Sequence, residues 1–204
     1  MQLYYSPTSP YARKVVVCAM ERGLDEQIER LQTDGFGEAH RAANPLGKVP
    51  VLVPDDGSTG LYDSLVICDH LDRIGTAPRL IPETGTARDR VLCLHALGQG
   101  ITDAALLMQI QRVRGQKLGQ DLPDDWWMDR QRTAIRTAAD TANADAEALG
   151  GTINLGQISL ATALSYLDFR FPDLEWRSGR AALAAWYEAF AARPSMTATA
   201  PPAG

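Results

Sequence analysis

The chain has 204 residues, of which 45% are hydrophobic and 22% charged, and its formal net charge is -5. The composition is typical of a soluble globular protein, the length suits two small domains, and the absence of clustered Lys and Arg argues against a nucleic-acid partner. No apolar run reaches the roughly 18 residues that a membrane helix needs, and the first residues lack the pattern of a secretory signal. We therefore expect a cytoplasmic protein without membrane spans.

The first part of the chain alternates between strand and helix patterns, with turn-forming residues between them. Apolar residues at helical spacing after Tyr11 indicate a helix that Gly23 ends. β-type runs bounded by Gly, Pro, Asp and Ser indicate short strands. The expected elements are strands over Gln2–Tyr5, Gln27–Gln32 and Val49–Val53, a fourth short strand at 60–62, and helices over Tyr11–Arg22 and Ser64–Ile74.

The rest of the chain carries helical patterns only. The Pro- and Gly-containing stretch 77–85 indicates a linker, so we expect an α/β domain over 1–76 and an all-helical domain over 86–204. The expected helices cover Thr86–Arg114, Trp126–Leu149, Leu160–Phe169 and Gly179–Ala192. The tail from Ser195 is rich in Ala, Thr and Pro, and we expect it to be loose.

The cysteines and histidines are scattered along the chain and form neither a redox pair nor a zinc-ligand spacing. We therefore expect no metal. Cys18, Cys68 and Cys93 each stand among apolar neighbours and are expected to be small buried residues.

A serine stands at the junction between the first strand and the first helix, in the run Ser9-Pro10-Tyr11-Ala12. Proline is well tolerated in a first helical turn, and a serine before it is a natural N-cap. The alternative is functional, because the hydroxyl and the positive helix end can face an anionic ligand atom.

The run from Asn44 to Leu52 places Pro50 at the start of an apolar strand. Proline cannot donate to a ladder, so this position indicates a cis bond or a sheet edge. The backbone N–H and C=O of Val49 would then be free to pair with an extended peptide ligand, as an added strand would.

The pair Asp63-Ser64 opens the second helix of the α/β part. Helix capping explains both residues when they are considered alone. The orphan N–H groups and the Ser64 hydroxyl also suit a carboxylate, whereas Asp63 suits an ammonium group.

Taken together, these three features offer sites for a thiol, a peptide backbone and the two charged ends of an amino acid, which is the outline of glutathione. The chain resembles the cytosolic glutathione transferase family. The sequence from Ser6 to Lys14 resembles that of its serine-type members, which are the zeta and tau classes and many bacterial relatives. The resemblance implies a thioredoxin-like first domain, an all-helical second domain, a homodimer and a glutathione-dependent transferase that detoxifies small electrophiles.

The resemblance also implies roles for individual residues. Ser9 would contact the thiol of glutathione as the catalytic residue, with Thr8 and Ser6 as rivals. The other expected glutathione contacts are Tyr11, Lys48 toward the glycine carboxylate, Val49 beside Pro50, and Asp63 and Ser64 at the γ-glutamyl end. The candidates for the second, electrophilic substrate are Gln99, Thr102, Asp103 and Leu106, for which core or solvent-facing roles are the alternative.

The run Ser9-Pro10-Tyr11-Ala12 lacks both sulfurs of the Cys-Pro-Tyr-Cys motif in glutaredoxin-like relatives, so dithiol exchange is excluded. Ser9 can stabilise a thiolate that the ligand supplies, which then attacks an electrophile. A non-catalytic binding or scaffold protein is the main alternative, and isomerisation, dehalogenation or peroxide reduction are other glutathione chemistries that stay open.

Several further expectations concern structure. Arg13 and Lys14 should lie on a solvated helix face, the alternative being that they add positive charge near the site. Trp126-Trp127 should belong to the core or line a pocket. The resemblance to the family also places Ser159 and Thr162 at the position of a helix-capping box, where Thr162 replaces the usual aspartate.

Overall fold

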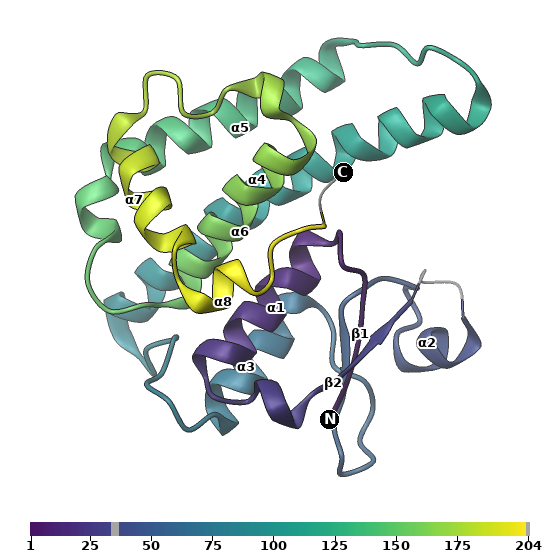
Figure 1. Cartoon of the computed structure of the whole chain (residues 1–204), viewed down its shortest axis with the longest axis vertical. Coiled ribbons are helices and arrows are strands. Elements are labelled where there is room, and N and C mark those ends of the chain that lie inside the picture. Colours follow the sequence, from purple (N-terminus) through teal and green to yellow (C-terminus); the bar gives the residue numbers. More distant parts are fainter. Residues whose placement is uncertain (34–36, 203–204) are drawn as a thin grey trace. The chain divides into compact units, whose positions relative to one another are not determined.

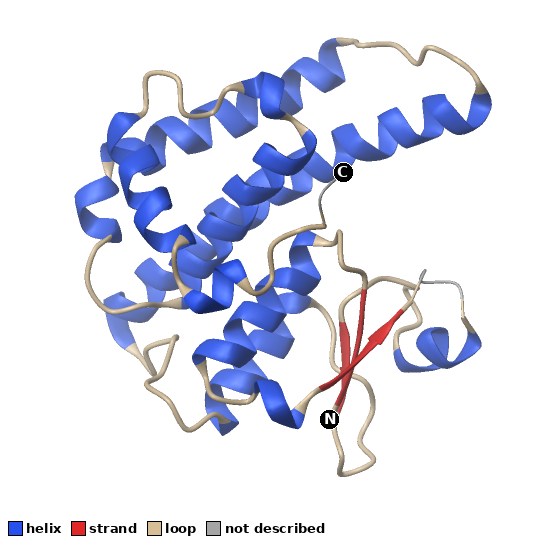
Figure 2. Ribbon diagram, viewed as in Figure 1, coloured by secondary structure: helices blue, strands red, loops and turns tan. Residues whose placement is uncertain are grey.

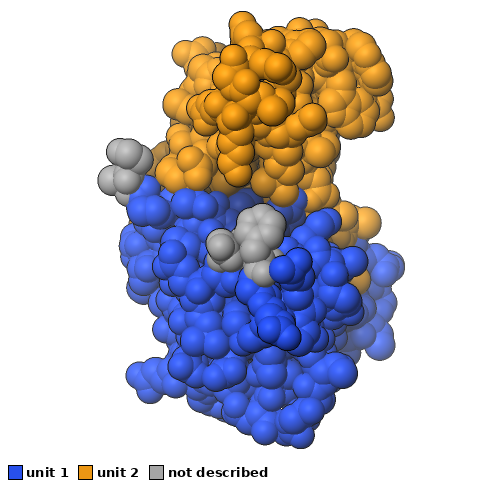
Figure 3. Space-filling model, turned by 90° about the vertical axis from the view of Figure 1, so that its right-hand side faces the viewer, with its two compact units in different colours: residues 1–91, 194–204 blue, residues 92–193 orange. Residues whose placement is uncertain are grey.

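The computed structural model describes residues 1–33 and 37–202. The chain forms two compact units (Figure 3). Unit 1 contains residues 1–91 and 194–204, and unit 2 contains residues 92–193. Each unit is described by itself.

Unit 1 is built on a mixed sheet of three strands, β1 (Gln2–Tyr5), β2 (Glu29–Gln32) and β3 (Val51–Val53), in the order β2-β1-β3 (Figure 2). The central strand β1 runs parallel to β2 and antiparallel to β3. The predicted bounds of β1 are correct. The predicted fourth strand is reduced to one bridge, between Leu52 and Leu61.

Helices α1 (Pro10–Glu21) and α3 (Ser64–Ile74) pack together on one side of this sheet (Figure 1). Both were predicted, because a side-chain cap and an apolar face define each of them locally. The short helix α2 (Glu38–Ala43), on the other side of the sheet, was not predicted. It lacks a side-chain cap and buries only His40, so its sequence carries neither a cap signal nor an apolar face. The 3₁₀ turn η1 (Asp25–Gln27) precedes β2.

Unit 2 is entirely helical. Its central helix α6 is buried from Leu155 to Leu167, and α4 crosses it so closely that a Cβ atom on Gly98 would lie 2.6 Å from the Leu160 nitrogen. Glycine is therefore required at this crossing. The elements from the linker onward are α4 (Gly85–Leu118), whose first residues belong to unit 1, α5 (Trp126–Ala144), η2 (Ala146–Leu149), α6 (Leu155–Arg170), η3 (Pro172–Leu174) and α7 (Ala181–Ala191).

The capping box of α6 lies five residues before the predicted one, so that prediction was wrong in register. Asn154 accepts a hydrogen bond from the Gln157 amide at 3.1 Å, and the Gln157 side chain accepts one from the Asn154 amide at 2.9 Å. Ser159 and Thr162 lie inside the helix, where Ser159 Oγ donates to the His95 carbonyl at 3.0 Å. The apolar run from Leu160 hid the start of the helix, because α6 is buried on all sides and shows no amphipathic period.

Four expectations about exposure were wrong. Arg13 and Lys14 are 9% and 2% exposed, so they do not form a solvated face. Trp126 and Trp127 are 72% and 42% exposed and lie outside the core, and Cys93 is exposed. The C-terminal tail is not loose over its first residues: α8 (Pro194–Thr197) packs against α1 and buries Ser195 and Met196 (Figure 1). These outcomes depend on contacts between distant parts of the chain.

Among the described residues, α4 is the one helix that is long and apolar enough to cross a membrane by length and composition. The expectation that no such stretch exists is therefore corrected. A core helix of a soluble protein meets the same criterion, and 44% of the most apolar window of α4 is buried within the structure.

Candidate functional site

Three segments of unit 1 leave the sheet at the same end. Because β3 runs antiparallel to β1, with Val51 opposite Tyr4, the residues before Val51 lie beside those that follow β1. The bridge between Leu52 and Leu61 is also antiparallel, so the chain after Leu61 runs toward Pro50. The sheet thus brings together the start of α1, the loop before β3 and the start of α3.

Ser9 is the N-cap of α1. Its Oγ accepts a hydrogen bond from the Ala12 amide at 3.3 Å, and its own amide donates to the Ser6 carbonyl at 3.0 Å. A hydroxyl has one donor and two acceptor sites, so this cap uses an acceptor site of Ser9 and leaves the proton for a ligand. Thr8 is half-buried, with its Oγ1 3.3 Å from Ser6 Oγ, and Tyr11 is half-buried in the first turn of α1.

The peptide bond between Val49 and Pro50 is cis, which is one of the two alternatives that Pro50 indicated. Two side chains hold the loop before this bond in place. The Lys48 carbonyl accepts hydrogen bonds from Asn44 Nδ2 at 2.7 Å and from His40 Nε2 at 3.1 Å. Val49 itself lies beyond the last pair of the β1–β3 ladder, and Lys48 is exposed.

Sequence reasoning missed the roles of His40 and Asn44 in fixing this loop. Asn44 had a local signal, since asparagine before proline and glycine is typical of a turn, and its Oδ1 accepts from the Leu46 amide at 3.0 Å. His40 had none, because it is brought to the loop by α2, the helix that was not predicted. The His40 side chain is buried and also contacts the ring of Tyr4.

Asp63 is the N-cap of α3, with its Oδ1 accepting from the Leu65 amide at 3.1 Å, and the peptide bond before it is cis. Asp63 is exposed, whereas Ser64 is 1% exposed. Among the residues that the structure describes, the Ser64 Oγ has no hydrogen-bond partner. A buried hydroxyl without a protein partner is uncommon and indicates a position where a ligand can supply the missing bond.

The four candidates for the second substrate lie on α4, in unit 2. Gln99 Nε2 donates to Asp103 Oδ1 at 3.2 Å, and Asp103 is exposed. Thr102 is buried, and its hydroxyl donates to the Gly98 carbonyl at 3.0 Å. Leu106 is half-buried on the same helix.

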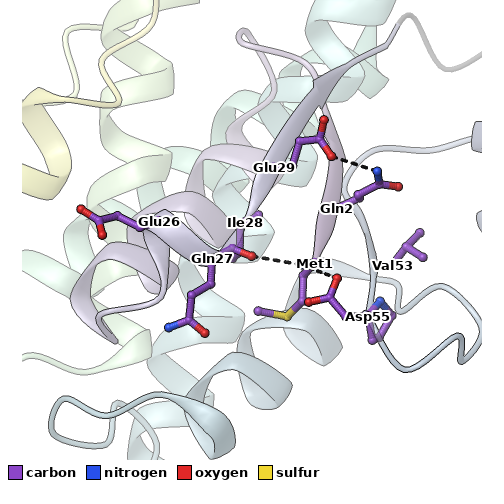
Figure 4. Close-up of a pocket in the computed structure, with 9 residues that line it drawn as sticks. Met1, Gln2, Glu26, Gln27, Ile28, Glu29, Val53 and Asp55 are labelled. Carbon is purple, nitrogen blue, oxygen red and sulfur yellow. Dashed lines mark hydrogen bonds and ion pairs between the residues drawn. The ribbon is translucent and has the colours of Figure 1, made fainter.

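A pocket opens at the other end of the sheet, where β1 and β2 begin and β3 ends (Figure 4). There the Met1 ammonium donates to the Gln27 carbonyl at 3.0 Å and pairs with Asp55 at 2.7 Å. None of the predicted site residues lines this pocket. Over residues 1–33 and 37–202, no group of three His, Cys, Asp or Glu side chains could hold a metal ion.

Comparisons with known proteins match the chain over both units. The glutathione S-transferase N-terminal domain matches residues 8–74 and the glutathione S-transferase C-terminal domain matches residues 127–189. An uncharacterised GST-like protein of Escherichia coli, YibF, is 31% identical over 205 aligned residues that cover 99% of both chains.

Solved structures show the same relationship. A glutathione transferase family member from Pseudomonas fluorescens covers 99% of both chains with 41% identity and a TM-score of 0.88, and was crystallised with bound glutathione. The match to its crystal structure with bound S-(propanoic acid)-glutathione has 42% identity, a TM-score of 0.86 and full coverage of both chains. A glutathione S-transferase from Methylobacillus flagellatus is 33% identical with a TM-score of 0.87 over 98% of both chains.

The expected fold class is confirmed by these matches: a thioredoxin-like α/β domain is followed by an all-helical domain. The chain is 31% identical to YibF over nearly its whole length, and both glutathione S-transferase domains match it. This chain belongs to the glutathione S-transferase family.

Proposed function

We propose that this protein binds glutathione at the end of the sheet where α1 and α3 begin, and transfers the whole glutathionyl group, through its sulfur, to a small electrophile. The observation that carries the proposal is the set of unused hydrogen-bonding groups at this end. The cap of α1 leaves the Ser9 proton for a ligand, the Val49 backbone lies beyond the ladder, and the buried Ser64 hydroxyl has no partner among the described residues. The glutathione bound to the Pseudomonas fluorescens relative supports the same ligand.

The parts of glutathione match these groups in order. Ser64 and the first amides of α3 suit the γ-glutamyl carboxylate, and Asp63 suits its ammonium group. The Val49 backbone can pair with the cysteinyl part as an added strand. Lys48 is exposed on the same loop, where its ammonium group can meet the glycine carboxylate.

Ser9 would act on the thiol. A free thiol has a pKa of about 8.5 and is mostly protonated at neutral pH, so a reactive site must favour the anion. The Ser9 proton and the positive end of α1 both do this. Lowering the thiol pKa by about two units corresponds to about 2.7 kcal/mol of preferential stabilisation of the thiolate. The thiol proton passes to solvent without a protein base, and the thiolate sulfur then forms a bond to the electrophilic carbon. In a substitution that carbon releases its leaving group with the bonding electrons, and in an addition the π bond opens and the product takes up a proton from solvent.

Other features of the function follow the family. We propose that the enzyme is a cytoplasmic homodimer that detoxifies small electrophiles and that Tyr11 lies against the bound glutathione. Gln99, Thr102, Asp103 and Leu106 stay candidates for the side that receives the electrophile.

The first test of this proposal is glutathione binding by the wild type and by Ser64→Ala. Because the Ser64 hydroxyl has no protein partner among the described residues, its removal should leave the melting temperature without ligand nearly unchanged. The affinity for glutathione should fall by about tenfold or more, the value of one charge-assisted hydrogen bond. Ser58→Ala, an exposed serine in a turn of the same unit, is the matched control and should bind like the wild type.

A wild-type protein that glutathione resin does not retain and that millimolar glutathione does not stabilise would favour the scaffold alternative. If glutathione binds, assays with halogenated, unsaturated, isomerisable and peroxide substrates separate conjugation from the other glutathione chemistries.

A further inference from the structure

The segment after α7 returns to unit 1 and lies along α1. Its helix α8 buries Ser195 and Met196, and hydrogen bonds connect it to both ends of α1. Near the end of α1, Ser195 Oγ donates to Glu21 Oε1 at 2.5 Å. Near its start, the Arg13 guanidinium reaches Met196 and Thr199.

The Arg13 guanidinium donates two hydrogen bonds, from two of its nitrogen atoms, to the C-terminal segment. Arg13 Nη2 donates to the Met196 carbonyl at 3.0 Å, and Arg13 Nε donates to Thr199 Oγ1 at 3.2 Å. The side chain is 9% exposed, so these bonds lie in a largely water-free environment where they hold their geometry firmly. A guanidinium offers its donors in a rigid fork, so two bonds to one segment fix both position and orientation.

Arg13 is also bonded directly to the serine that caps the helix. Its backbone amide donates to the Ser9 carbonyl at 3.0 Å, which is the first hydrogen bond of α1. The side chain of Arg13 therefore connects the Ser9 turn to the C-terminal segment. Helix termini fray readily, and a side-chain contact in the first turn restrains that fraying.

We propose that the segment 194–199 acts through Arg13 as a positioning element, which holds the first turn of α1 and the Ser9 hydroxyl in place beside the thiol of the ligand. The proposal rests on the glutathione chemistry proposed above. Arg13 and Thr199 are positioning residues, because they act on the thiol through Ser9 and the start of the helix. Loosening this contact should impair ionisation of the bound thiol more than binding, since the groups proposed to hold the two ends of glutathione lie on other segments.

The test measures the pKa of the bound thiol from the ultraviolet absorbance of the thiolate as a function of pH, together with kcat and KM for glutathione. Arg13→Gln and Thr199→Val should each raise the thiol pKa by about half a unit to one unit, with a several-fold loss of kcat near neutral pH. The KM for glutathione should change by less than about threefold. The double variant should resemble Arg13→Gln alone, because Arg13→Gln already removes the hydrogen bond to Thr199.

Two further variants separate positioning from general stability. Arg73→Gln removes an arginine whose ion pair with Asp69 is exposed on α3, and should leave the thiol pKa unchanged. Thr199→Ser keeps the hydroxyl that accepts from Arg13 and should restore the wild-type pKa. Thr199→Val removes only one half-buried hydroxyl. If Arg13→Gln does not fold, the thiol pKa of Thr199→Val still tests the proposal.

A wild-type protein that binds no glutathione would reject the proposed function. A wild type that binds glutathione and ionises it, with the same thiol pKa in Arg13→Gln, Thr199→Val and the double variant, would reject the positioning role alone.

Discussion

Arg22 and Asp72 form an ion pair in the interior of unit 1, with 3.2 Å between Arg22 Nε and Asp72 Oδ1 and side chains that are 1% and 0% exposed. The Asp72 carboxylate also accepts from the amides of Leu80 at 2.6 Å and Ile81 at 3.2 Å. Arg79 Nε donates to it at 2.8 Å, and this hydrogen bond raises the pKa of the Arg79 guanidinium. One carboxylate thus joins the end of α1, the end of α3 and the segment that leads to α4.

Asp72→Asn should destabilise the fold by about 3 to 5 kcal/mol, because it leaves the buried Arg22 charge without a counter-ion and turns an amide toward N–H donors. Urea unfolding measures this loss of free energy. Asp69→Asn is the matched control on the same helix. Its ion pair with Arg73 is exposed, so the cost should stay below about 1 kcal/mol. Equal costs for the two variants would contradict the importance of the buried pair.

Ser9→Ala should lower turnover by about 100-fold, the usual loss when one preorganised donor to a developing anion is removed, while most of the glutathione affinity is kept. Steady-state kinetics and glutathione titration measure the two effects. The variant also loses a helix cap worth about 1 kcal/mol, which thermal melting reports separately.

Thr8→Ala is the comparison for Ser9, because Thr8 is the rival for the thiol contact and its hydroxyl already lies 3.3 Å from Ser6 Oγ. We expect it to retain nearly full turnover. Full activity in Ser9→Ala together with a loss in Thr8→Ala would assign the thiol contact to Thr8.

The three cysteines should differ sharply in reactivity. Cys18 and Cys68 are buried, and the hydrogen bond with Cys68 together with burial raises the pKa of the Cys18 thiol well above its ordinary value. Because the thiolate is the reactive form, only the exposed Cys93 should react rapidly with a thiol reagent in the native protein. Cys93→Ser should react only after unfolding, and rapid labelling of that variant would contradict the burial of the other two.

His70 should make stability depend on pH in the mildly acidic range. Burial lowers its pKa in the folded state below the ordinary value of 6.5. As the pH falls through 6.5, the unfolded chain takes up the proton before the folded protein does, so the free energy of unfolding decreases. The decrease between about pH 7.5 and about pH 5.5 should be smaller in His70→Gln than in the wild type, as measured by urea unfolding. Equal decreases would show that His70 does not contribute.

Local sequence patterns predicted an element correctly where its cap and its apolar face lie within its own residues. The bounds of β1 and α3 were predicted correctly, and α1 was placed within one residue, because a strand, a cap and an apolar face are properties of a few neighbouring side chains. A proline at the start of a strand indicated a cis bond or a sheet edge, and the bond before Pro50 is cis. The start of α6 was placed too late, because a helix that is buried on all sides carries no amphipathic signal.

Local sequence patterns specified β1, α1 and α3, the serine and aspartate caps of these two helices, and the family to which the chain belongs, but they did not reveal α2 or α8. Three other features became visible only in the folded chain: Arg13 is buried against the C-terminal segment, His40 and Asn44 hold the loop before Pro50, and the Ser64 hydroxyl is buried without a partner among the described residues. The physical reason is distance along the chain: caps and periodicity act between neighbours, whereas the burial and pairing of a polar side chain depend on residues that folding brings to it.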